Sequence, residues 1–93
     1  MKNLKKIIQN VNKTIRREKS KINVWNREVV QYEAIIDILS KVEEREKIKS
    51  YREMINNNYS KIDISLDNIE SCKKIINILK RTEKSLKRGE QSA

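Results

Sequence analysis

The sequence predicts an all-α protein, in the form of a long antiparallel helical hairpin of the coiled-coil type. Proline is absent and the single glycine, Gly89, stands near the C-terminus, so almost nothing in the chain interrupts a helix. Apolar residues recur at alternating steps of four and three residues in two long runs, the spacing of a coiled-coil seam. A helix-start signal separates the two runs.

The first apolar run begins at Leu4 and ends at Leu39, and Glu18 is its one polar position. We therefore expect a helix over residues 3–39, roughly 55 Å long at ~1.5 Å per residue. Trp25 stands on this seam, where we expect it to pack in the core, with an interface anchor as the alternative. The candidate helix–helix interface residues of this run are Ile8, Val11, Ile15, Ile22, Trp25, Val29 and Ile36.

The second run begins at Tyr51 and ends at Leu86, and its spacing predicts a helix over residues 41–88. Ser40 is followed three positions later by Glu43, a capping box that predicts the start of this helix. The tail, residues 89–93, is expected to be disordered. The candidate interface residues of this run are Ile62, Ile69, Ile76 and Leu79.

Two features leave alternatives open within a single helical domain of residues 1–93. Asn56-Asn57-Asn58 is the weakest helical stretch, and a break there would give a three-helix bundle. Residues 20–24 resemble residues 60–64, and capping at each Ser-Lys pair would give four short helices. A two-helix hairpin covers only one face of each helix. We therefore expect a homodimer, packed as a four-helix bundle.

Positive charge is concentrated in the two terminal segments. Residues 2–21 carry +7 and residues 73–88 carry +6, whereas residues 22–72 carry −3. A hairpin that turns near Ser40 would bring the two basic segments together at its open end, where a polyanion would relieve their repulsion. The candidate polyanion-binding residues are Lys5, Lys6, Lys13, Arg16, Arg17, Lys80, Arg81, Lys84, Lys87 and Arg88.

The residue types that are missing argue against enzymatic chemistry. Histidine is absent, which removes the usual general base and a common metal ligand. The lone Cys72 is expected to be a reduced core residue in a cytoplasmic protein. We therefore expect no enzyme, no metal or other cofactor and no small-molecule substrate. No apolar run approaches a membrane span, and attachment to a membrane is the least favoured reading.

The sequence leaves two functional hypotheses. The first is a small interaction or regulatory protein that binds a partner protein, which the long seam and the lack of catalytic groups favour; its small size fits a phage or another mobile element. The alternative is a protein that binds DNA or RNA through its basic end. No zinc-ligand spacing or aromatic RNA-binding motif is present, so such binding is expected to rest on phosphate contacts.

Overall fold

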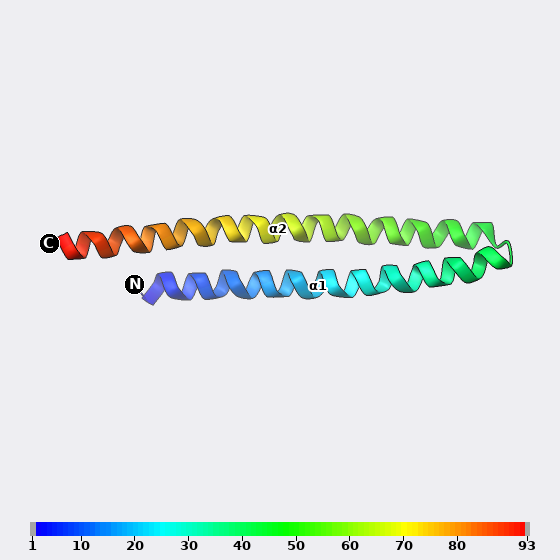
Figure 1. The fold of residues 1–93 in the computed structure, drawn as a ribbon, viewed down its shortest axis with the longest axis horizontal. Coiled ribbons are helices and arrows are strands. Elements are labelled where there is room, and N and C mark those ends of the chain that lie inside the picture. Colours follow the sequence, from blue (N-terminus) through cyan, green and yellow to red (C-terminus); the bar gives the residue numbers. More distant parts are fainter. Residues whose placement is uncertain (1, 93) are drawn as a thin grey trace.

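Two long α-helices form an antiparallel hairpin in the computed structural model, which describes the backbone of residues 2–92 and the side chains of residues 3–89 (Figure 1). Helix α1 spans Lys2–Lys41 and helix α2 spans Arg45–Ser92. The hairpin measures 77 × 15 × 13 Å, so it is a rod one helix pair in cross-section. The predicted helical hairpin is confirmed, and residues 2–92 contain no β-strand.

Helix α2 passes through the asparagine run without a break, so the three-helix and four-helix alternatives are wrong. Asn58 points into the seam, where its amide has partners on α1. The Ser60 hydroxyl donates a hydrogen bond to the carbonyl oxygen of Asn56, 3.2 Å away within the same helix. These polar side chains are satisfied inside a continuous helix and therefore do not start a new one.

The turn lies at residues 42–44, and its geometry differs from the predicted capping box. Ser40 remains in the last turn of α1, where its hydroxyl donates to the Ile36 carbonyl oxygen 2.8 Å away. Glu43 instead has a left-handed backbone, φ 58°, and the Glu44 N–H donates to the Leu39 carbonyl oxygen, 3.3 Å away. This is a Schellman-type helix end. It lets α1 extend past Leu39, whose side chain is half-buried in the seam.

Contacts between the helices keep one register along the hairpin. The rings of Tyr32 and Tyr51 lie 5.8 Å apart between centroids near the turn, and Asn58 Nδ2 lies 3.3 Å from the carbonyl oxygen of Trp25 farther along. The same register sets residues 20–24 beside the similar residues 60–64. The two similar segments of the sequence therefore lie side by side in the hairpin.

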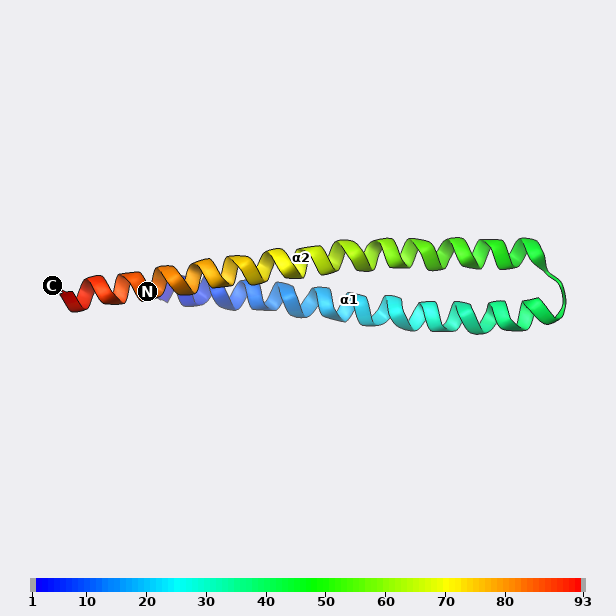
Figure 2. The same cartoon turned by 45° about the horizontal axis from the view of Figure 1, so that its top comes forward.

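The C-terminal end of α2 projects beyond the start of α1 (Figures 1 and 2). When the same register is continued to this end, Leu79 of α2 lies level with Leu4 of α1. The turns of α2 that follow Leu79 therefore have no helix opposite them. Helix α2 also runs to Ser92, four residues beyond the predicted end, so the segment expected to be a disordered tail is helical as far as it is described. Glycine weakens a helix by about 1 kcal/mol but keeps its N–H donor, so Gly89 does not have to end it. Residue 93 lies outside the described residues.

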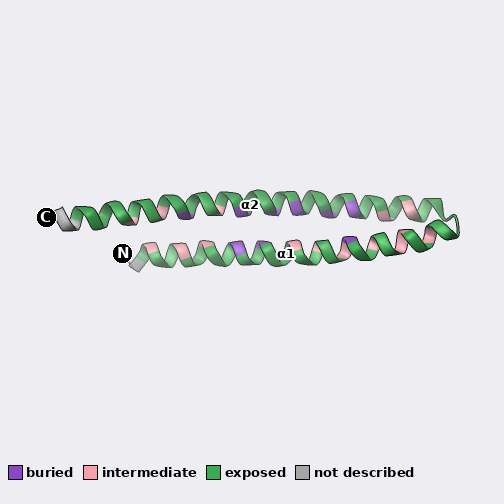
Figure 3. Ribbon diagram, in the orientation of Figure 1, coloured by how far each residue is buried: buried purple, intermediate pink, exposed green. Residues whose placement is uncertain are grey.

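The buried side chains follow the predicted seam (Figure 3). All eleven candidate interface residues are buried or half-buried between the two helices. The polar seam positions Glu18, Asn58 and Ser65 are buried as well, at 9%, 4% and 3% exposure. The spacing therefore predicts the covered side of each helix even where the residue is polar. The buried apolar side chains are Ile15, Val29, Ile55, Ile62, Ile69 and Ile76.

Candidate functional site

The open end of the hairpin, formed by residues 2–11 of α1 and 73–92 of α2, carries nearly all of the net charge of the protein. These two segments contain ten Lys and Arg residues and two acidic residues, Glu83 and Glu90, which gives +8. The rest of the chain contains twelve basic and eleven acidic residues, which gives +1. The hairpin thus turns a basic composition into a strongly basic end on a nearly neutral rod.

The structure divides the predicted polyanion-binding residues into two groups, all of them exposed. Seven lie at the open end: Lys5, Lys6, Lys80, Arg81, Lys84, Lys87 and Arg88. The other three, Lys13, Arg16 and Arg17, lie farther along α1, level with a segment of α2 that contains Asp63, Asp67 and Glu70. A charge count along one helix misses this compensation, because the acidic segment becomes a neighbour only through the register of the hairpin.

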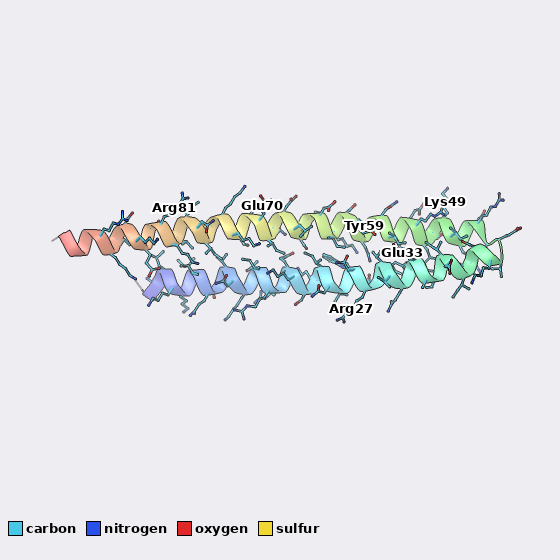
Figure 4. The ribbon with its side chains drawn as sticks, viewed as in Figure 1. Arg27, Glu33, Lys49, Tyr59, Glu70 and Arg81 are labelled. Carbon is cyan, nitrogen blue, oxygen red and sulfur yellow. The ribbon has the colours of Figure 1, made fainter. Side chains whose placement is uncertain are left out.

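The projecting turns of α2 present basic side chains without a helix beside them. Leu86 occupies the next seam position here and is 49% exposed, because the seam has no partner at this level. Glu83 pairs with Lys87 along the helix, at 3.3 Å between Oε1 and Nζ. Arg81, nearer the paired region, points away from α1 (Figure 4). A large ligand can therefore approach the end of the rod from several directions.

A buried polar layer lies between the open end and the middle of the hairpin. The Ser65 hydroxyl donates to the Glu18 carboxylate and lowers the pKa of that carboxyl; burial opposes this, and Lys21 and Asn68 also lower the pKa. The Lys21 Nζ lies 3.4 Å from Glu18 Oε1. A carboxylate held in its ionised form by donors from both helices is suited to fixing the pairing of the helices.

Other kinds of site have little support in the described part of the chain. The described residues contain no group of three or more His, Cys, Asp or Glu side chains that could hold a metal ion. Cys72 is a half-buried free thiol beside the core cluster of Ile15, Ile69 and Ile76. None of the helices, within their described residues, is long and apolar enough to cross a membrane.

Comparisons with protein families, curated proteins and solved structures gave no match for this chain, so its function is argued from the residues and their arrangement.

Proposed function

We propose that the protein is a non-enzymatic helical module whose open end binds a polyanion, with DNA or RNA as the ligand. The observation that supports this proposal is the concentration of +8 of the net charge of +9 at one end of a long rod. Repulsion among these groups costs stability in the free protein. Contact with phosphates relieves that repulsion and releases counterions from the nucleic acid.

The binding mode follows from the residue types at the open end. Lysine predominates over arginine there, and lysine acts as a mobile point charge toward phosphate. Phosphate contacts position a protein on nucleic acid but do not read its sequence. We therefore propose binding that depends weakly on sequence and steeply on salt.

The test measures affinity for a fluorescent duplex of about 20 base pairs at ~50 mM and ~200 mM salt. The open-end variant is Lys80→Gln/Arg81→Gln/Lys84→Gln. The control is Lys47→Gln/Lys49→Gln/Arg52→Gln, which removes the same charge from exposed positions of α2 near the turn. We expect the first variant to lose about tenfold or more in affinity at ~50 mM salt and the control less than about threefold. Equal losses, or no binding by the parent chain to DNA or RNA, would overturn the proposal.

A second candidate function, regulation through a partner protein, is favoured by apolar side chains outside the seam. Val30 and Leu66 are 64% and 49% exposed, although they are of the type that usually lies inside. As part of the same proposal we place the protein in the cytoplasm, whose reducing conditions would keep Cys72 a free thiol. Capture experiments in the native host that recover nucleic acid but no protein would reject this candidate.

A further inference from the structure

One long side of the hairpin is apolar, and we call it the apolar face. Its positions are counted from the β-branched seam residues, which are Ile8, Ile15, Ile22, Val29 and Ile36 on α1, and Ile55, Ile62, Ile69 and Ile76 on α2. The face consists of the residue directly before each of these seam residues and the second residue after each of them. Of these eighteen positions eight are apolar and four are charged. On the opposite side, formed by the first and fourth residues after the same seam residues, three are apolar and eight are charged.

Two contacts show that these positions of α1 and α2 lie on the same side of the seam. Lys21, directly before Ile22, and Asn68, directly before Ile69, both interact with the carboxylate of Glu18. On the same side, Asn58 donates to Glu28, the residue directly before Val29, at 3.0 Å. The apolar positions of the two helices therefore form one continuous surface.

Apolar side chains gather at the two ends of this face. The open-end cluster is Ile7, Ile75 and Ile78, at 46%, 45% and 61% exposure. Near the turn, at the other end of the face, Ile38 is 63% exposed and lies beside the half-buried Ile35. Val24 and Ile64 lie near the middle of the face, at 50% and 62% exposure.

We propose that a second copy of the chain covers this face in an antiparallel orientation, so that the two open ends lie at opposite ends of the dimer. This inference does not depend on nucleic-acid binding. The charge distribution selects the orientation, because a parallel pair would bring two ends of +8 together, whereas an antiparallel pair sets each beside the nearly neutral half of the other copy.

One alignment pairs both apolar and charged residues of α1 with complementary residues of the second copy. With Ile7 opposite Ile38 of the second copy, Arg17 stands opposite Glu28 of the second copy. Both pairs are centred on residues 22–23, so a single two-fold axis generates them. Such an isologous contact makes each of these pairs twice and closes on itself.

The face is large enough for a stable dimer. It is as wide as the hairpin, 15 Å, and α1 is roughly 60 Å long at ~1.5 Å per residue. Covering it removes on the order of 900 Å² from each copy, compared with about 800 Å² per partner in a standard interface.

The first test measures mass by sedimentation equilibrium up to ~1 mM chain. We expect the full chain to approach twice 11.1 kDa. Ile38→Lys, on the apolar face, should raise the dissociation constant about tenfold or more. Val30→Lys is the matched control, because Val30 is 64% exposed on the same helix but on the other side. A chain that stays at 11.1 kDa, or equal effects of the two variants, would overturn the proposal.

The second test measures orientation by double electron–electron resonance in a Cys72→Ser background. A spin label at Glu46→Cys, near the turn, should give a distance of about 45 Å between copies in the antiparallel dimer. A label at Ser20→Cys, near the centre, should give about 20 Å. A distance of about 20 Å from the label near the turn would indicate a parallel pair and reject the proposed orientation.

Discussion

Asn58 of α2 donates hydrogen bonds to α1 from the middle of an isoleucine seam. Its Nδ2 lies 3.3 Å from the carbonyl oxygen of Trp25 and 3.0 Å from Glu28 Oε2, and the residue is 4% exposed. A buried amide on a coiled-coil seam keeps its partners only in one register, and it is less stabilising than an apolar residue at the same position. The Asn58–Trp25 contact thus favours one pairing of the helices at a cost in stability.

Replacing this amide tests that cost. We expect Asn58→Leu to raise the free energy of unfolding by about 1 kcal/mol, because leucine fills the seam and the half-buried Glu28 regains water. Urea denaturation followed by circular dichroism at a fixed, low chain concentration measures the change. The exposed neighbour Asn57→Leu is the control and should change stability by less than about 0.5 kcal/mol. A net loss of stability in Asn58→Leu would show that the hydrogen bonds outweigh packing.

The seam could be read from the sequence because spacing, and not hydrophobicity alone, decides which side of a helix is covered. Glu18 and Asn58 interrupt the apolar pattern, yet both are buried where the spacing places them. The local signals were less informative. Ser40 and Ser60 both resemble helix starts, but each hydroxyl donates to a carbonyl oxygen four residues earlier in a continuous helix. Short sequence patterns do not distinguish these two uses of serine.

The site could be predicted only in part for a related reason. The basic terminal segments are evident from composition, and the hairpin brings them to one end as expected. The compensation of Arg16 and Arg17 by acidic residues depends on which residues of α2 lie opposite them. That register is set by contacts between the helices, such as the one between Glu18 and Ser65. Charge counts along the chain carry no information about it.

The Glu18–Ser65 hydrogen bond should appear in the pH dependence of stability. It lowers the folded-state pKa of Glu18 below its ordinary value, so the carboxylate contributes stability that is fully present above the ordinary value. This contribution is lost as the pH falls through the lower, folded-state pKa. Ser65→Ala should raise the pKa of Glu18 in a carboxyl-carbon NMR titration and reduce the loss of stability between pH ~7 and pH ~3.

The control for this titration is Ser71→Ala, which removes an exposed hydroxyl from the same helix. It should leave both the pKa of Glu18 and the acid-induced loss of stability unchanged. An unchanged pKa of Glu18 in Ser65→Ala would mean that Lys21 and Asn68 hold the carboxylate without the serine.

The left-handed backbone at Glu43 predicts a stabilising substitution in the turn. Its φ of 58° is strained for a residue with a Cβ atom but not for glycine. We expect Glu43→Gly to raise the free energy of unfolding by about 0.5–1 kcal/mol. Arg52→Gly, at an exposed position in the interior of α2, should lower it by about 1 kcal/mol, because glycine weakens an ordinary interior helical position. If both glycine variants destabilise the protein in thermal unfolding, the turn does not have this backbone in solution.

The projection of α2 beyond α1 predicts that equivalent seam positions differ in their contribution to stability. Ile69 is 6% exposed and packs with Ile15 and Ile76, whereas Leu86 is 49% exposed where α1 has ended. Ile69→Ala should lower the free energy of unfolding by about 2–3 kcal/mol, since it removes buried methyl groups and leaves a cavity. Leu86→Ala should change it by less than about 0.5 kcal/mol, because its side chain is largely solvated in the folded protein. Both changes in the free energy of unfolding are measured by urea denaturation, at a chain concentration at which sedimentation shows only the monomer. A loss at Leu86 comparable to that at Ile69 would require a partner for the end of α2, from α1 in another register or from a second chain.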